Sequence, residues 1–356
     1  MTSALQQHTT WTEDRAPVRT DPSAVPGAET EGRAVAITSA ARPSLRDRLP
    51  CEKPSRPEAA TNTARCLDAF PYALTAKFQF TLNQDKSRQV NYVSDFLCVG
   101  AQKGGTTALR AHLSRHPQIC IPRDEIHFFD NDSLSWQSPD YCDYWNLLRS
   151  EFASPLPKDR FAAENTSRPR IVGEVTPIYM YWLECAKRIH RYNPKIKLIF
   201  LLRNPVARAY SHWSMETSRG NDNLSFSVCI REEPLRIAAV GQMQHRIFSY
   251  VDRGRYFQQI QRLLEFFELD QMLFLSSEDF FLEPWSSLRK VTDFLGIDAY
   301  EDFLVIHRRM GSYREGPSIL EWSYVYDQLK SDIDQLENFL GWDLSFWRQP
   351  WDGVCF

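Results

Sequence analysis

Four short apolar runs, each followed by a longer segment with helical periodicity, organise the chain after residue 93. The runs are DFLCV at 95–99, RIVGE at 170–174, KLIFLL at 197–202 and MLFL at 272–275. The third run is apolar at five consecutive positions, which is typical of a strand in a parallel sheet that is buried on both faces. The pattern therefore predicts four strands, and the strand at 197–202 is the clearest.

Helical patterns alternate with these strands. They predict helices over 106–115, 177–192, 205–219, 284–295 and 318–340. Strands that alternate with helices favour a central parallel sheet covered by helices. The predicted fold class is therefore α/β, a P-loop-like central parallel sheet flanked by helices in a single globular domain.

The N-terminal part of the chain lacks these patterns. Residues 1–65 are rich in Ala, Ser, Thr, Pro and charges of both signs, and Trp11 is their only aromatic residue. Such a segment buries too little apolar surface to offset its ordering entropy, so we expect disorder. We interpret residues 66–92 as transitional and residues 93–356 as the folded domain.

Composition narrows the function classes. The chain has 356 residues, 43% of them hydrophobic, and a net charge of −3, which gives no reason to expect a nucleic-acid partner. It has no apolar run of about 18 residues, so no membrane span is predicted. We expect a cytoplasmic protein. The eight cysteines form no C-x-x-C pair and are expected to be reduced.

The first predicted strand leads into GAQKGGTT at 100–107. A Walker loop has lysine directly before its hydroxyl residue, whereas here Thr106 holds that place and Lys103 lies inside the loop. Gly104 and Gly105 would let backbone N–H groups approach an anion, and the positive end of the following helix would face it. The sequence predicts a phosphate site that is not built for a magnesium-bound triphosphate.

Two further segments carry candidate chemistry. Arg203 follows the clearest strand, and Ser211 lies eight residues later, two turns into the next helix. Ligands of open α/β sheets bind at such strand ends, so a second anion site is a candidate here. In DEIHFFD at 124–130, an extended backbone would put Glu125 and His127 on one side, as an acid–base pair requires.

Together the three segments resemble the PAPS-dependent sulfotransferases, especially the carbohydrate branch with heparan sulfate 3-O-sulfotransferases, N-sulfotransferase domains and their bacterial relatives. The loop at 100–107 is similar to that family's G-x-x-K-G-G-T. LRNP at 202–205 with RAYS at 208–211 resembles its 3′-phosphate signature, L-R-[DN]-P…R-x-x-S. The segment at 124–130 resembles its catalytic K-E-[IV]-H-F-F-D, except at the first position. The resemblance extends from about residue 93 to the C-terminus. Because animal relatives are bound in the Golgi, it also implies a protein of the Golgi lumen if an anchor is missing from this sequence.

The resemblance implies a role for each segment. It implies that Lys103 stabilises the leaving oxygen of 3′-phosphoadenylyl sulfate (PAPS), that Glu125 is the general base and that His127 assists it. It also implies which residues bind the co-substrate: Lys103, Gly104, Gly105, Thr106 and Thr107 hold its 5′-phosphosulfate, Arg203 and Ser211 hold its 3′-phosphate, and a late loop with Arg309, Gly311, Ser312 and Tyr313 covers it. The expected partners are PAPS or its product PAP and a hydroxyl acceptor, with no metal required.

Two departures bear on the acceptor. Asp124 stands where the family's catalytic segment begins with lysine, and Val175 replaces the lysine of its E-K-[ST]-P motif. Fewer cations make an anionic polymer a less suitable acceptor, so we expect an acceptor other than heparan sulfate. A carbohydrate hydroxyl is preferred; the alternatives are a small natural product or lipid alcohol, a P-loop kinase or NTPase, and a nucleotide-binding protein without catalysis.

Overall fold

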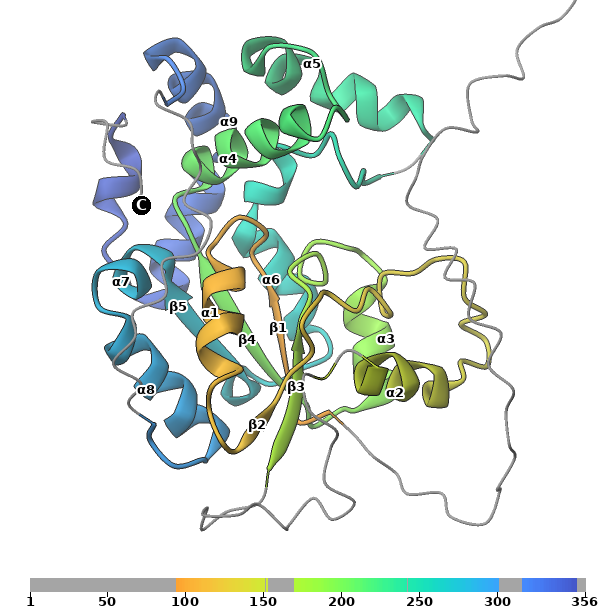
Figure 1. Cartoon of the computed structure of the whole chain (residues 1–356). Helices are drawn as coiled ribbons and strands as arrows, with labels where there is room; N and C mark the ends of the chain where they lie inside the picture. Colours follow the sequence, from red (N-terminus) through yellow and green to blue (C-terminus); the bar gives the residue numbers. More distant parts are fainter. Residues whose placement is uncertain (1–93, 151, 153–169, 242, 301–315, 351–356) are drawn as a thin grey trace, which may run out of the picture. The chain divides into compact units, whose positions relative to one another are not determined.

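The structure, a computed structural model, describes residues 94–150, 152, 170–241, 243–300 and 316–350, all within the compact unit Asn83–Phe356. Five parallel strands form one sheet in the order β2-β3-β1-β4-β5 (Figure 1). Their bounds are β1 Phe96–Gly100, β2 Ile119–Cys120, β3 Ile171–Val175, β4 Lys197–Leu202 and β5 Met272–Ser276. The predicted α/β class with a parallel central sheet is confirmed, and β2 is a strand that the sequence analysis missed.

The strand order creates a crevice above the middle of the sheet. The chain leaves β1 toward β2 and β3 on one side, and it leaves β4 toward β5 on the other. In open α/β sheets, connections that diverge in this way leave a ligand-binding crevice at the carboxyl ends of the strands. The glycine-rich loop follows β1, and Arg203 follows β4, so both candidate anion sites lie at this switch point.

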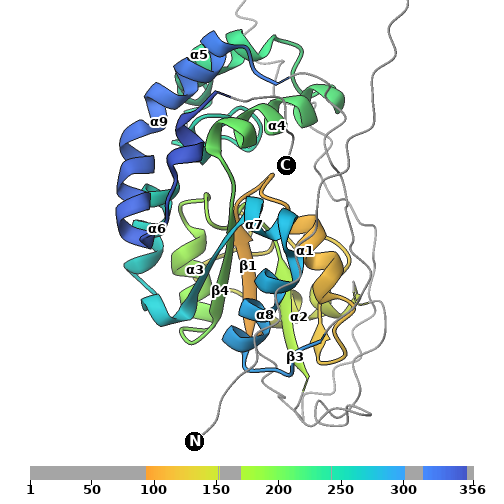
Figure 2. The ribbon, with the colours of Figure 1, turned by 90° about the vertical axis from the view of Figure 1, so that its left-hand side faces the viewer.

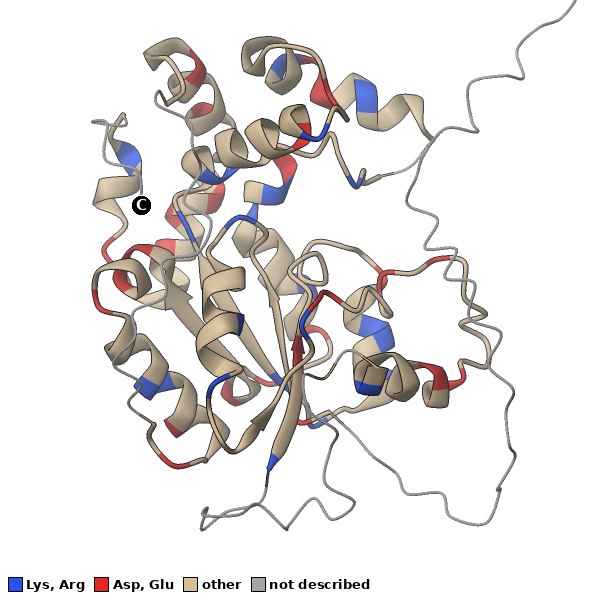
Figure 3. Ribbon diagram, viewed as in Figure 1, with Lys and Arg blue, Asp and Glu red and all other residues tan. Residues whose placement is uncertain are grey.

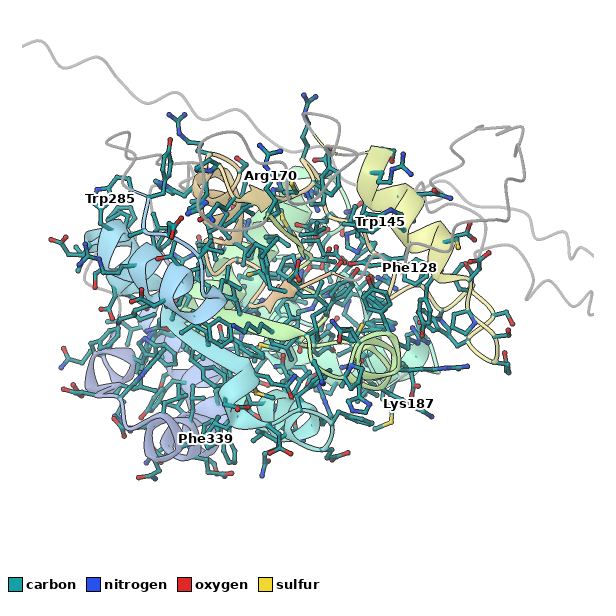
Figure 4. The ribbon with its side chains drawn as sticks, turned by 90° about the horizontal axis from the view of Figure 1, so that it is seen from below. Phe128, Trp145, Arg170, Lys187, Trp285 and Phe339 are labelled. Atoms are coloured by element: carbon teal, nitrogen blue, oxygen red, sulfur yellow. The ribbon has the colours of Figure 1, made fainter. Side chains whose placement is uncertain are left out.

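Two apolar cores separate the helices into layers (Figure 2). On one face lie α1 Thr106–Leu113, α7 Ser277–Leu282 and α8 Pro284–Leu295. The larger core packs α2 Tyr141–Ser150, α3 Cys185–Tyr192, α4 Pro205–Ser218, α5 Phe226–Ala239, α6 Tyr256–Leu264 and α9 Ile319–Leu340. Trp285 of α8 and Phe339 of α9 lie on either side of the strands in Figure 4. Burial of both sheet faces explains why β4 is a continuous apolar run.

One predicted helix is too long. The sequence predicts a helix over 177–192, but α3 begins only at Cys185. Residues 178–182 are all buried, which an amphipathic helix does not allow, and the N–H of Met180 donates to the carbonyl of Val99 at 2.8 Å. Tertiary contacts with the end of β1 therefore override the helical pattern here.

Two smaller predictions concern the cysteines and the membrane. No disulfide joins the five cysteines within the described part of the chain. Within the same residues, no helix is both long enough and apolar enough to cross a bilayer.

Candidate active site

The loop after β1 is held by backbone contacts. The N–H of Ala101 donates to the carbonyl of Leu201 at 3.0 Å, and the N–H of Gly104 donates to the carbonyl of Ala101 at 2.9 Å. Gly105 is the N-cap of α1 with φ 95°, a left-handed conformation that favours glycine, and no side chain caps this helix. The first N–H groups of a helix have no acceptor within it, so the start of α1 can receive an anion.

Gly104 is required by close packing rather than by its backbone angle. A Cβ atom at this position would lie 2.2 Å from the carbonyl oxygen of Leu201 and 2.9 Å from that of Ala101. The hydroxyl of Ser277 also donates to the carbonyl of Gly104. The loop is thus pressed against β4, and only glycine fits at 104.

The second predicted anion site adjoins the first. Asn204 caps α4, since its side chain accepts from the N–H groups of Val206 and Ala207, and Pro205 fixes the first turn. This cap places Arg203 at the crevice, where its Nη1 donates to the carbonyl of Lys103 at 3.2 Å. The Arg203 carbonyl in turn accepts from the hydroxyl of Tyr256 at 3.0 Å.

Helix α4 also faces the lysine of the loop. Lys103 Nζ lies 3.5 Å from the sulfur of Met215, which is one turn after Ser211 on the same helix. Lys103 therefore lies next to Arg203 and contacts α4 one turn after Ser211. Blue ribbon segments at the carboxyl ends of β1 and β4 in Figure 3 mark this concentration of positive charge.

Further buried cations lie behind these side chains. Arg208 is fully buried, and its Nε and Nη1 have no hydrogen-bond partner among the described residues. Burial lowers the pKa of Arg208 and lowers that of Arg253 to about 10. Burial, together with the charges of Arg253 and Arg208, also lowers the pKa of His212, so this imidazole is neutral. Uncompensated buried cations are costly unless an anion completes the site.

The catalytic segment at 124–130 forms a chain of charged contacts. His127 Nε2 lies 3.2 Å from Glu125 Oε2, and its Nδ1 lies 3.1 Å from Asp130 Oδ2. Burial favours the neutral imidazole, but the hydrogen bonds with Asp130 and Glu125 outweigh it and raise the pKa of His127 to about 10. The imidazole is therefore protonated at neutral pH, and Glu125 is the better base of the pair.

Two arginines connect this segment to the phosphate loop. Arg246 forms an ion pair with Asp130, and its carbonyl accepts from Arg253 Nη2 at 2.6 Å. Arg253 also donates to the side chain of Gln102 in the loop. The catalytic segment and the phosphate loop are therefore part of one hydrogen-bonded framework.

The structure brings Lys103 together with Arg203 and Glu125 together with His127, and it adds other residues around them. Arg246 and Arg253 were not among the predicted site residues; Arg253 lies in the short 3-10 helix Asp252–Gly254, and Arg246 precedes it outside any helix or strand. Val175, expected beside an acceptor, lies instead in the core under α1 with 1% of its surface exposed. The late-loop residues Arg309, Gly311, Ser312 and Tyr313 lie outside the described residues. No cluster of three metal-ligating side chains occurs in the part that is described.

The fold and the site define an α/β protein with a glycine-rich loop of the phosphate-binding type and no Walker lysine. Comparison with known proteins is consistent with this class. The family model of the sulfotransferase domain matches residues 93–315, more than half of the chain, so the protein belongs to this family.

The chain is 31% identical over 204 residues to human heparan sulfate glucosamine 3-O-sulfotransferase 6, covering 56% of this chain and 52% of the relative. It is also 31% identical to mouse heparan sulfate glucosamine 3-O-sulfotransferase 3B1 over 205 residues, 56% of this chain and 45% of the relative. The chain thus spans about half the length of these curated relatives. A sulfotransferase from Alicyclobacillus acidocaldarius superposes with a TM-score of 0.57 at 25% identity, over 72% of this chain and 100% of that one.

Proposed function

We propose that the protein transfers the sulfuryl group of PAPS to a hydroxyl group, preferably of a carbohydrate, by in-line displacement at sulfur. The observation that carries this proposal is the contact between the phosphate loop and the strand β4 signature, with Arg203 donating to the carbonyl of Lys103. This contact supports adjacent sites for a 5′-phosphosulfate and a 3′-phosphate, as a nucleotide with phosphate at both ends requires. The relatives' printed names supply the preference for a carbohydrate.

The residues of the site fit this co-substrate. The close packing of Gly104 against Leu201 allows backbone N–H groups of the loop to approach a phosphate, and the start of α1 adds the positive end of a helix dipole. Buried Arg253, which donates to Gln102 of the loop, adds positive charge near an anionic ligand. The 3′-phosphate would bind to Arg203 and Ser211, and the phosphosulfate would bind to the loop from Lys103 to Thr107.

The reaction then needs one proton acceptor and one stabilised leaving group. Glu125 takes the proton of the acceptor hydroxyl, whose oxygen forms a bond to sulfur. The bond from sulfur to the bridging oxygen breaks, its electron pair stays on that oxygen, and PAP leaves. Lys103 stabilises the charge that develops there. His127 is protonated, contacts both Glu125 and Asp130, and orients the base. Positioning of the acceptor hydroxyl against sulfur supplies much of the rate.

The acceptor is proposed to be uncharged. Asp124 is exposed beside Glu125 and adds negative charge where an anionic polymer would approach. Val175 is buried and cannot contact an acceptor, so the loss of a lysine at this position does not bear on acceptor charge. The proposal of an uncharged acceptor therefore depends on Asp124.

The test is transfer from radiolabelled PAPS to a panel of desulfated heparan, neutral glycosides, small alcohols and lipid alcohols. Transfer to neutral glycosides, together with a gain on heparan in Asp124→Lys, would support the proposal. Exclusive transfer to heparan would contradict the acceptor preference. Hydrolysis of ATP with no PAPS-dependent transfer would contradict the whole proposal.

A further inference from the structure

A buried carboxylate that takes no part in the proposed reaction lies directly beneath the catalytic segment. Glu174 is in β3, and none of its surface is exposed. Its Oε1 accepts from the hydroxyl of Tyr144 at 2.9 Å and from that of Tyr179 at 3.2 Å, and its Oε2 accepts from the hydroxyl of Thr176 at 2.7 Å. An ionised carboxylate only accepts, so it draws the hydrogens of all three hydroxyls inward.

Two of these hydroxyls in turn hold the backbone of the catalytic segment. The N–H of Ile126 donates to Thr176 Oγ1 at 3.1 Å, and the N–H of Phe128 donates to the Tyr179 oxygen at 3.0 Å. These N–H groups flank His127 on either side. A hydroxyl whose hydrogen points at Glu174 presents its lone pairs to them, so the direction of the hydroxyls matters.

The conformation of His127 explains why the segment needs such support. Its φ is 53°, in the left-handed region that a side chain with Cβ adopts at a cost of about 1–2 kcal/mol. The two hydrogen bonds from its neighbours fix this conformation. Through it, the imidazole is aimed at both Glu125 and Asp130.

We propose that Glu174 is a positioning residue of the sulfuryl transfer: it sets the direction of the Thr176 and Tyr179 hydroxyls and thereby holds the Glu125–His127 pair in its working geometry. This inference rests on the proposed function. Glu174 touches neither the base nor the co-substrate and acts through the two hydroxyls.

Protonation of Glu174 would reverse this arrangement. The protonated carboxyl has a hydrogen to donate, so one of the hydroxyls must accept it and turn its own hydrogen away. Burial raises the pKa of Glu174, against the hydroxyl hydrogen bonds and the charge of His127, to about 7. Three tyrosines also face this carboxylate: Tyr144 of α2, Tyr179 after β3, and Tyr192 at the end of α3. Burial raises the pKa of each, so they stay neutral. The positioning effect is therefore present above pH 7 and lost as the pH falls through that value.

The first experiment compares two substitutions at one position. Thr176→Val has nearly the same shape but no hydroxyl, whereas Thr176→Ser keeps the hydroxyl. We expect kcat to fall about tenfold in Thr176→Val, as loss of one buried hydrogen bond implies, and to remain within about twofold of wild type in Thr176→Ser. KM for PAPS and calorimetric affinity for PAP stay within about twofold in both, because neither change touches the nucleotide site. Tyr179→Phe provides a second variant with the same expectation.

The second readout does not depend on turnover. In wild-type protein, the His127 ring followed by NMR should titrate near pH 10, with His127→Asn used to assign its signal. Thr176→Val and Glu174→Gln should move that pKa toward 6.5 because the imidazole is no longer held between its carboxylates. Thr176→Ser should leave it in place. In wild type, kcat should fall as the pH drops through about 7, and this fall should be absent from the pH profile of Glu174→Gln.

The results answer two separate questions: whether Glu174 positions the Glu125–His127 pair, and whether the protein transfers a sulfuryl group. Wild-type kcat and an unmoved His127 titration in both Thr176→Val and Tyr179→Phe would overturn the positioning role. So would a limb near pH 7 that persists in Glu174→Gln. If the His127 pKa moves as expected but wild-type protein transfers no sulfuryl group, the proposed function fails, and only the effect of Glu174 on the geometry of the Glu125–His127 pair is supported.

Discussion

Substitution of Gly104 tests whether the phosphate loop works by close backbone packing. A Cβ at this residue would lie 2.2 Å from the Leu201 carbonyl oxygen, about 1 Å inside an ordinary contact, and that atom is backbone with no freedom to turn away. The loop must therefore move and break the hydrogen bond from the Ala101 N–H to the same carbonyl. Overpacking costs about 1–3 kcal/mol, and an unsatisfied buried group adds about 1–3 kcal/mol.

Gly104→Ala should therefore lower Tm by about 4–24 °C at ~2–4 °C per kcal/mol. It should also weaken PAP binding about tenfold or more, because the shifted loop no longer presents its N–H groups. Gly105→Ala is the matched control: its Cβ would make an ordinary 3.5 Å contact with Leu201 Cδ2, and only the φ of 95° is strained, which costs about 1–2 kcal/mol. A Gly104→Ala protein that melts and binds PAP like wild type, or like Gly105→Ala, would refute the packing argument.

Three more outcomes follow from the site. Lys103→Ala should lower kcat about 10²–10³-fold while PAP affinity falls less than tenfold, as measured by steady-state kinetics and calorimetry. Substitution of an exposed lysine, Lys187→Ala, should leave both values at those of wild type. An equal loss in kcat and in PAP affinity would argue against a leaving-group role for Lys103. Because the Glu174 pKa is raised from 4.5 to about 7, the folded protein binds this proton more tightly than the unfolded chain, so the carboxylate destabilises the fold increasingly as the pH rises from 4.5 to 7. Denaturant unfolding of wild type and Glu174→Gln should show their stability difference changing by about 3 kcal/mol across that window, and a constant difference would contradict the raised pKa. Treatment with EDTA should leave transfer from PAPS unchanged, and loss of transfer that Mg²⁺ restores would contradict the metal-free mechanism.

Periodicity predicted the parts of the fold that depend on local sequence. The strands at 95–99 and 197–202 were found because continuous apolar runs report burial on two faces, and the helix at 284–295 because its apolar stripe matches the helical period. The helix expected at 177–192 was wrong over its first half, where contacts with β1 decide the backbone. A two-residue strand such as β2 carries too little pattern to be seen.

The candidate site was predictable where residues close in sequence carry the chemistry. Glu125 and His127, two residues apart, do form a pair, and the loop and the β4 signature do meet. Arg253 contributes to the same site from far along the chain, so its part in the site follows only from tertiary contacts. Glu174 was visible within a motif, but its burial and its hydroxyl partners are set by the sheet and by α2.

The central claim is that the crevice at β1 and β4 is built for a nucleotide with a 3′-phosphate and a phosphosulfate rather than for a triphosphate. Calorimetry with PAP, AMP and Mg-ATP on wild type and on Arg203→Ala tests this claim most directly. The account predicts that PAP binds wild type about 10–100 times more tightly than AMP, as hydrogen bonds of about 1.5–3 kcal/mol to a charged group imply, and that Arg203→Ala removes most of this preference. Mg-ATP binding more tightly than PAP, or a preference for PAP that survives in Arg203→Ala, would contradict it.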